Sequence, residues 1–160
     1  MQDYYKTCYL IFLGGNYDKQ ILSTEQYLSI NLSKFAPVIC FEYPRFTNLL
    51  KVITKRIDLI ELVSKNLIIH HSFGILPFGR SILPINFFNH LINYILLKFI
   101  LKNRLDNSTV ISFTPEYSLV NWLFKSKNVI YHILDNYTSL PWWSGIFEKN
   151  QFYILERRVV

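Results

Sequence analysis

The sequence predicts an α/β domain in which a mostly parallel sheet lies between two layers of helices. Three observations support this fold class. Short, continuous apolar runs, typical of strands buried on both faces, alternate with helical segments along the chain. Hydrophobic residues make up 51% of the sequence and charged residues only 18%, which excludes a disordered chain. A length of 160 residues is that of one ordinary domain, so we expect a single domain over residues 1–160.

The first predicted strand is Cys8–Leu13, an apolar run that ends at Gly14 and Gly15. Glycines at the carboxyl end of a parallel strand allow a sharp turn and a close approach of backbone N–H groups to a ligand. Neither a G-x-G-x-x-G nor a G-x-x-x-x-G-K-S/T motif is present, so a dinucleotide or P-loop site is not supported. The alternative is a turn that needs glycine only for a positive φ.

A helix and a second strand complete this unit. Ser23 and Gln26 have the spacing of a capping box, which predicts that a helix begins there. Pro37 is expected to end the helix, and Val38–Phe41 reads as the second buried strand.

Disulfide and metal chemistry are not expected. Cys8 and Cys40 fall on the two neighbouring strands, where small thiols are ordinary core residues, and the chain start does not resemble a signal peptide, so we expect a reducing cytoplasm. His70 and His71 are adjacent on a predicted strand and therefore point to opposite faces, which prevents them from binding one ion together.

The middle of the chain predicts four segments. Thr47–Lys55 is expected as a short helix, Ile57–Leu62 and Leu67–His71 as a strand pair, and Gly74–Pro84 as a loop. Ile85–Arg104 is the longest apolar segment. A polar stripe at helical spacing makes it a wide-faced amphipathic helix that packs on the sheet, rather than a membrane span. The stripe consists of Asn86, Asn89, His90 and Asn93.

The positive charge of the chain is regional. Residues 45–104 contain nine Lys/Arg and two Asp/Glu, a net charge of +7, so the rest of the chain carries −1 of the total +6. An anionic membrane surface is therefore an expected partner, with peripheral attachment through this segment. Nucleic acid ranks last, because neither a recognition helix nor interleaved exposed aromatic residues accompany the charge.

Two further strands, Thr109–Phe113 and Asn128–Leu134, are followed by carboxylates. Glu116 and Asp135 would project from the carboxyl ends of adjacent parallel strands, where either can serve as a general base or bind a hydroxyl group. A helix cap or turn is the ordinary alternative for Asp135. Trp142 lies in an aromatic loop suited to stacking on a sugar ring or to burial.

From Phe147 the chain predicts an amphipathic helix and then stops at Val160, before the strand that this alternation calls for. We therefore expect an incomplete domain.

The order of these motifs resembles the N-terminal, acceptor-side domain of two-Rossmann-domain (GT-B) glycosyltransferases related to family 4. The resemblance rests on five segments along most of the chain: the strand with the GG loop, STEQYLSINLSKF, VICFEYP, NLIIHHSFGILPFGR and VIYHILDNYTSLP. One departure is that relatives often carry an arginine shortly before the glutamine that matches Gln26, where this chain has Ser23-Thr24-Glu25.

The resemblance implies a Rossmann-like, three-layer fold and transfer of a sugar from a nucleotide-sugar donor to a glycan or lipid-linked acceptor in polysaccharide or cell-envelope synthesis. It implies no cofactor besides the donor substrate, and the donor-binding C-terminal domain would be missing. Asp135 matches the acidic or polar acceptor-facing position, with Glu116 as the second candidate base. The implied substrate-binding residues are Gly14, Gly15, Asn16, Gln26, Tyr137 and Trp142. The alternative is a non-catalytic Rossmann-like binding or scaffold module.

Overall fold

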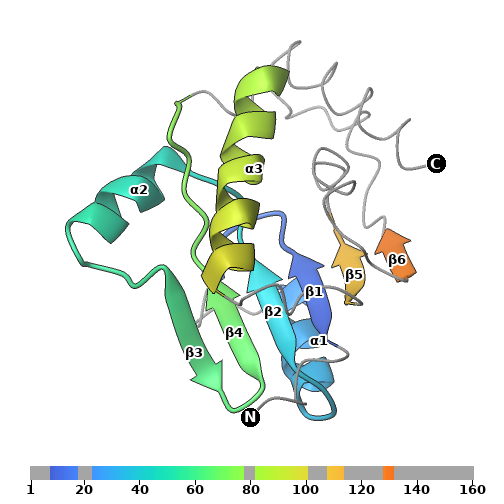
Figure 1. Ribbon diagram of the computed structural model, residues 1–160. Helices are drawn as coiled ribbons and strands as arrows, with labels where there is room; N and C mark the ends of the chain where they lie inside the picture. The colour runs from blue at the N-terminus through green and yellow to red at the C-terminus, as the bar shows by residue number, and fades with distance from the viewer. Residues whose placement is uncertain (1–7, 18–22, 78–81, 101–107, 114–127, 132–160) are drawn as a thin grey trace.

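The computed structural model of the chain describes residues 8–17, 23–77, 82–100, 108–113 and 128–131 (Figure 1). Within these ranges the chain alternates between strands and helices. In chain order the elements are β1 (Tyr9–Phe12), α1 (Thr24–Ser33), β2 (Val38–Phe41), α2 (Phe46–Ile53), β3 (Ile60–Ser64), β4 (Leu67–His70), α3 (Leu83–Ile100), β5 (Thr109–Ser112) and β6 (Asn128–Tyr131).

The described strands form one sheet in the order β3-β4-β2-β1-β5-β6. All neighbouring pairs are parallel except β3 and β4, which are antiparallel. β1 lies in the middle of the sheet, as its continuous apolar sequence predicts. The mixed α/β fold with a mostly parallel sheet is thus confirmed, and it is consistent with a Rossmann-like domain.

Two apolar cores lie on opposite faces of this sheet, because successive side chains of a strand alternate between faces. On one face, Phe12 and Phe41 pack with Tyr94 and Leu97 of α3. On the other face, the strand residues pack with Leu28, Ile30 and Leu32 of α1. Figure 1 shows α3 in front of the strands and α1 behind them. The domain therefore has the three layers that the sequence predicts.

The two cysteines remain free thiols, and the alternation between faces explains why. Cys8 belongs to the core on the α3 face, whereas Cys40 belongs to the core on the α1 face. Burial raises the pKa of Cys8 to about 11 and that of Cys40 to about 12, so both thiols are protonated at neutral pH.

The predicted start of α1 is confirmed. The Ser23 N–H donates to Gln26 Oε1 over 2.8 Å, and the Gln26 N–H donates to Ser23 Oγ over 3.3 Å. These reciprocal bonds satisfy two backbone donors that the first turn of a helix leaves without a partner.

The predicted strand pair is also confirmed, with a shift in its first strand. β4 begins at Leu67 as expected, but β3 covers Ile60–Ser64 rather than Ile57–Leu62. The difference arises because the chain reverses directly after Ser64, and the pairing of Ile60 with His70 then fixes the register. The short helix predicted at Thr47–Lys55 is α2, displaced by one residue at its start.

The long helix begins earlier than expected. Leu83 and Pro84 are helical, so the predicted loop at Gly74–Pro84 is two residues too long. Proline is compatible with the first turn of a helix, because the N–H group that it lacks has no helical acceptor there. Lys102 and Arg104, at the predicted end of the helix, lie outside the described residues.

The orientation of α3 differs from that of an ordinary amphipathic helix. Its polar stripe faces the sheet and is buried together with Tyr94 and Leu97, whereas Phe88, Ile95 and Phe99 are exposed on the opposite side. The stripe is buried because the side-chain amides of Asn89 and Asn93 bond backbone groups of the segment after β4. The Phe73 N–H donates to Asn93 Oδ1 over 2.9 Å, and Asn93 Nδ2 donates to the Phe73 carbonyl over 2.5 Å. Side-chain amides thus form the hydrogen bonds that a neighbouring strand would otherwise provide to the irregular segment after β4.

Candidate functional site

The glycine turn after β1 lies at the point where the strand order reverses. From β1 the chain progresses through β2 to β4 in one direction, whereas β5 and β6 extend the sheet in the other. In open α/β sheets, ligands bind outside the carboxyl ends of the strands at such a reversal. Gly14 and Gly15 follow β1 directly, and the Tyr43 N–H donates to the Gly15 carbonyl over 3.3 Å. The turn is therefore tied to the chain after β2.

The glycines do not adopt an unusual backbone conformation. No described glycine has a positive φ. A Cβ atom added to Gly15 would meet only Arg45 Nη2, at 3.9 Å, so the Arg45 guanidinium lies beside the turn. The sequence suggested that the backbone N–H groups of the turn are open to a ligand. In the structure, the Gly14 N–H donates to Glu25 Oε1 over 3.3 Å. A carboxylate thus already occupies one of these backbone donors.

The carboxyl group of Glu25 is half-buried. Burial raises the pKa of its carboxyl group, although the bond from Gly14 acts in the opposite direction. A backbone N–H, a guanidinium and a partly desolvated carboxylate thus lie together at this turn.

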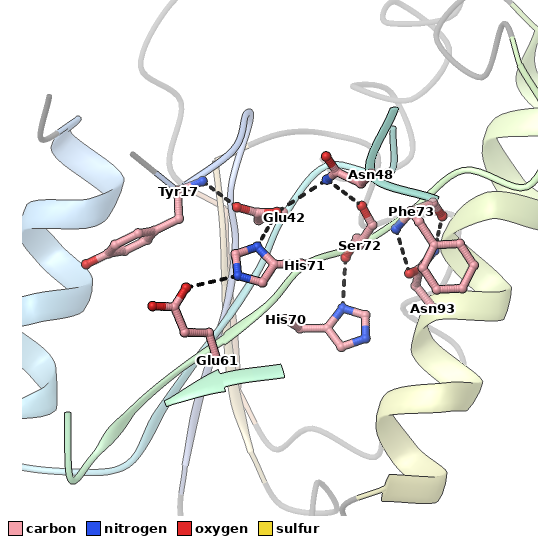
Figure 2. A network of polar contacts seen from close by, with 9 residues as sticks. All are labelled: Tyr17, Glu42, Asn48, Glu61, His70, His71, Ser72, Phe73 and Asn93. Atoms are coloured by element: carbon pink, nitrogen blue, oxygen red, sulfur yellow. Dashed lines mark hydrogen bonds and ion pairs between the residues drawn. The ribbon is translucent and has the colours of Figure 1, made fainter. Parts of the chain in front are cut away.

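Glu42 connects this turn to the ends of β2 and β4 (Figure 2). Its carboxylate is buried and accepts the Tyr17 N–H over 2.6 Å and Asn48 Nδ2 over 3.4 Å. Asn48 Nδ2 also donates to the Ser72 carbonyl over 2.9 Å. These bonds hold the start of α2 and the segment after β4 against the residues that follow the glycine turn.

His71 bridges Glu42 to the edge strand. Its Nδ1 lies 3.1 Å from Glu42 Oε2, and its Nε2 lies 3.1 Å from Glu61 Oε2. An ionised carboxylate only accepts hydrogen bonds, so the position between two carboxylates favours the form of His71 in which both ring nitrogens carry a proton. The hydrogen bond to Glu42 raises the pKa of His71 above 6.5, and partial burial opposes this rise. Glu61, His71 and Glu42 thus form a charged chain from the edge of the sheet to its interior.

The neighbouring His70 lies on the other face of the sheet, toward α3, as Figure 2 shows. Its ring is stacked on Phe41, with centroids 4.9 Å apart, and its Nδ1 lies 3.0 Å from Ser72 Oγ. His90 of α3 is stacked on the same Phe41 and meets Tyr43 edge-on. Burial lowers the pKa of each of these two histidines to about 3, so both are neutral. The prediction that His70 and His71 diverge is confirmed.

The predicted site residues fall into two groups. Gly14, Gly15 and Asn16 lie at the carboxyl edge, with Asn16 exposed. Gln26 is buried, and its Oε1 is used in the capping box of α1. Its predicted role in substrate binding stays a prediction. The remaining predicted site residues, Glu116, Asp135, Tyr137 and Trp142, lie outside the described residues.

Sequence reasoning missed Arg45, Glu42 and Glu61 as members of this edge. One signal was available for Glu61. In the hairpin it pairs with Ile69, so His71 is its diagonal neighbour on the same face of the sheet. Arg45 and Glu42 are brought to the edge by the parallel pairing of β2 with β1 and β4. Within the described residues, three or more metal-ligating side chains do not gather anywhere.

An open groove of about 730 Å³ lies on the α1 face of the sheet. Its lining is almost entirely apolar. It includes Tyr27 and Leu28 of α1 and Ile111 of β5. We place the candidate site at the carboxyl edge, because the strand order reverses there and the contacts of Glu42, His71 and Glu61 gather there.

No protein-family model matches the sequence, and no curated protein or solved structure matches it at a significant level. The function is therefore argued from the geometry of the carboxyl edge.

Proposed function

We propose that this chain is the acceptor-binding domain of a glycosyltransferase, which transfers a sugar from a nucleotide-sugar donor to a glycan or lipid-linked acceptor. The observation that carries the proposal is the position of Gly15 beside Arg45 Nη2, at the carboxyl edge where the strand order reverses. Sugar donors and lipid-linked acceptors both carry phosphate groups, and an arginine beside a glycine turn suits such groups.

The chemistry requires a base for the acceptor hydroxyl and positive charge for the leaving diphosphate. Arg45 and the backbone of Gly14 and Gly15 would supply the positive end. Asp135 is our first candidate for the base and Glu116 the second. Turnover would require a donor-binding domain in addition to this one, because the described sheet offers a single carboxyl edge for both substrates.

The proposed location is the cytoplasm, on the inner face of the membrane, where a lipid-linked acceptor would be met. Among the described helices, none combines the length and the apolar character that crossing a bilayer demands. Attachment would therefore be peripheral.

A non-catalytic binding or scaffold module is the second candidate function. It is favoured by the carboxylate of Glu25 on the Gly14 N–H, since a turn that is already satisfied by its own chain needs no ligand. The two proposals differ in whether an added ligand displaces Glu25.

Gly15→Val tests the proposal. The added side chain would block approach to the turn, whereas the fold should persist because the nearest atom to a Cβ at this position is the end of the flexible Arg45 side chain. We expect NMR titration with a short-chain prenyl-diphosphate sugar to shift the amide signals of Gly14 and Gly15 in the wild type, and to leave the valine variant unchanged.

Gly15→Ala adds a smaller side chain and serves as a control. Its affinity for the prenyl-diphosphate sugar should lie between those of the wild type and the valine variant. Equal affinity of all three proteins would contradict a ligand site at the turn and favour the scaffold module. Reading the gene downstream of Val160 gives an independent check, because the proposal expects a second β-α-β domain with two spaced glutamates there.

A further inference from the structure

The open groove on the α1 face lies between α1 and the part of the sheet formed by β5 and β6. Its lining includes Tyr27 and Leu28 of α1, Phe113 after β5 and Ile130 of β6. Tyr27 is 64% exposed and Ile130 is 48% exposed, so the groove continues into exposed apolar surface on both of its sides. An apolar surface of this kind is typical of a site that contacts another protein.

The topology of the sheet explains why this face stays open beside β5 and β6. Connections between parallel strands are right-handed, so their direction across the sheet decides which face they cover. The step from β1 to β2 runs in one direction with α1 on one face, and the step from β4 to β5 runs in the other direction with α3 on the opposite face. β6 continues in the direction of β5. The rule therefore predicts that a crossover to β6 covers the α3 face, and the groove needs an occupant from elsewhere.

The charge of the chain indicates which part of its surface can meet a second copy. Residues 45–104 have a net charge of +7, and the rest of the chain has a net charge of −1. α1 and β6 both belong to the nearly neutral part. Figure 1 shows α2, which belongs to the basic part, at the β3 end of the sheet and away from β6. Two copies that meet through α1 therefore keep their basic segments apart, whereas a symmetric contact through α2 would bring like charges together.

α1 is also complementary to itself. Its first turn carries the acidic Glu25, and its C-cap is the basic Lys34. The Lys34 Nζ donates to Asn31 Oδ1 over 2.8 Å, so this cation lies beside a residue that lines the groove. A two-fold axis across the middle of α1 makes the two helices antiparallel, and the basic end of each copy then meets the acidic end of the other.

Phe35 supplies an apolar side chain for such a contact to bury. It follows the C-cap of α1 directly and is 86% exposed. In the antiparallel arrangement, the end of α1 in one copy lies beside the start of α1 in the other, where Thr24 lines the groove. The ring would enter the groove of the second copy from that end, and the two-fold symmetry repeats the contact in the opposite direction.

We propose that two copies of this chain associate through a two-fold symmetric contact of their α1 helices, with Phe35 of each copy in the groove of the other. The contact surface, which we call the α1 surface, consists of Tyr27, Leu28, Asn31, Phe35 and Ile130. The inference does not depend on the proposed sugar transfer, since it rests on topology, charge and exposed apolar side chains. The titration of the glycine turn can therefore fail while the dimer forms, and the reverse also holds.

Sedimentation velocity of the full chain over a range of concentrations tests the α1 surface. We expect the wild type to show a monomer–dimer equilibrium. Tyr27→Asp should raise the dissociation constant roughly tenfold or more, because the contact would have to desolvate a carboxylate in each copy. Phe35→Ser should weaken the dimer as well, and its position is too exposed for the substitution to disturb the fold.

The matched control is Leu50→Asp. Leu50 lies on α2 and is 52% exposed, so it is comparably accessible, and its substitution changes the net charge by the same amount as Tyr27→Asp does. The dissociation constant of this variant should be equal to that of the wild type or lower, since a carboxylate on α2 reduces the repulsion between the basic segments.

Cross-linking locates the contact independently. The native thiols, Cys8 and Cys40, are buried, so a short bismaleimide reacts with a single added cysteine. Asn31→Cys should yield covalent dimers, because this position lies near the proposed two-fold axis. Thr54→Cys is the control, since Thr54 is exposed at the end of α2 and should yield few.

Three outcomes would overturn the proposal. The first is a wild type that stays monomeric at every soluble concentration, because the groove would then be covered by another part of the protein or by a different partner. The second is equal weakening of the dimer by Tyr27→Asp and Leu50→Asp. The third is cross-linking through position 54 as efficient as that through position 31. Thermal unfolding of each variant establishes that a weaker dimer does not come from a damaged fold.

Discussion

His70 and His71 end the same strand and occupy opposite environments. His71, on the α1 face, lies between the carboxylates of Glu42 and Glu61, which favour its charged form. His70, on the α3 face, is stacked on Phe41 and is neutral. The pKa of the first is raised and that of the second is lowered, although only one peptide bond separates them. The electrostatic role of a histidine is thus set by the face of the sheet on which it lies.

Around these two histidines, the two faces also differ in how completely their polar groups are satisfied. Around His71, both ring nitrogens and the Glu42 carboxylate have partners. On the α3 face, among the described residues, both ring nitrogens of His90, Nε2 of His70 and Nδ2 of Asn86 are buried without a hydrogen-bond partner. Each such group costs about 1–3 kcal/mol. The α1 side of the edge is therefore stabilised by the contacts between His71 and two carboxylates. The α3 side is stabilised by the Asn93 amide and by aromatic contacts of Phe41, which offset the cost of the unsatisfied groups.

The largest expected effect comes from removing the amide that holds the α3 side. Asn93→Leu would leave both the N–H and the carbonyl of Phe73 buried without a partner, at a cost of about 2–6 kcal/mol of unfolding free energy. Urea unfolding measures this cost. Asn31→Leu is the control, since the Asn31 amide bonds the Tyr27 carbonyl and Lys34 Nζ in exposed positions, and it should change stability by less than about 0.5 kcal/mol. Similar effects of the two substitutions would contradict the clamping role of Asn93.

The next largest effect concerns acid stability. The imidazoles of His70 and His90 have pKa values of about 3 in the folded chain and ordinary values near 6.5 after unfolding. Unfolding therefore takes up protons below pH 6.5, and stability falls as the pH decreases toward 3. His90→Leu removes one of these groups together with two unsatisfied nitrogens. We expect it to raise stability at pH 7 by about 1–3 kcal/mol and by a further ~1.4 kcal/mol for each pH unit below 6. An unchanged difference between wild type and variant from pH 7 to pH 5 would refute this account.

The smallest effect is expected on the α1 side, and its sign is opposite. Because the pKa of His71 is raised above 6.5, its ion pairs contribute stability that is fully present below pH 6.5 and is lost as the pH rises through the folded pKa. Glu61→Gln removes the negative charge beside Nε2 and should lower the pKa of His71, while the bond to Glu42 keeps part of the rise. NMR titration of the His71 ring in both proteins measures this change. A pKa that does not move would show that Glu61 has no electrostatic influence on the histidine.

Local sequence signals predicted the elements well. The capping box of Ser23 and Gln26, the stop at Pro37 and the apolar runs of the central strands act within a few residues, so periodicity and turn chemistry suffice to find them. The inversion of α3 was not predictable in this way. Its polar stripe has the spacing of a solvent-facing side, and only the position of the irregular segment after β4 turns it inward.

Only the part of the candidate site that is local in sequence was predictable. The glycine turn could be found because it is contiguous with β1. The pairing of His71 with Glu42 and Glu61 depends on strand order and hairpin register, which bring together residues 29 and 10 positions apart. Charge and motif spacing along the chain do not contain that information.

The irregular register of β3 has a consequence for the solubility of the domain. β3 is at one end of the described strand order, so its outer edge presents backbone groups to which a strand from another molecule can pair. Its register shifts between Leu62 and Ser64, which leaves Val63 without a partner in β4. Such a bulge bends and twists the strand, so that a straight foreign strand matches it only over a few residues. Leu62 and Val63 are exposed, and a regular edge strand with such residues would favour aggregation by strand pairing between molecules. The bulge lowers that risk.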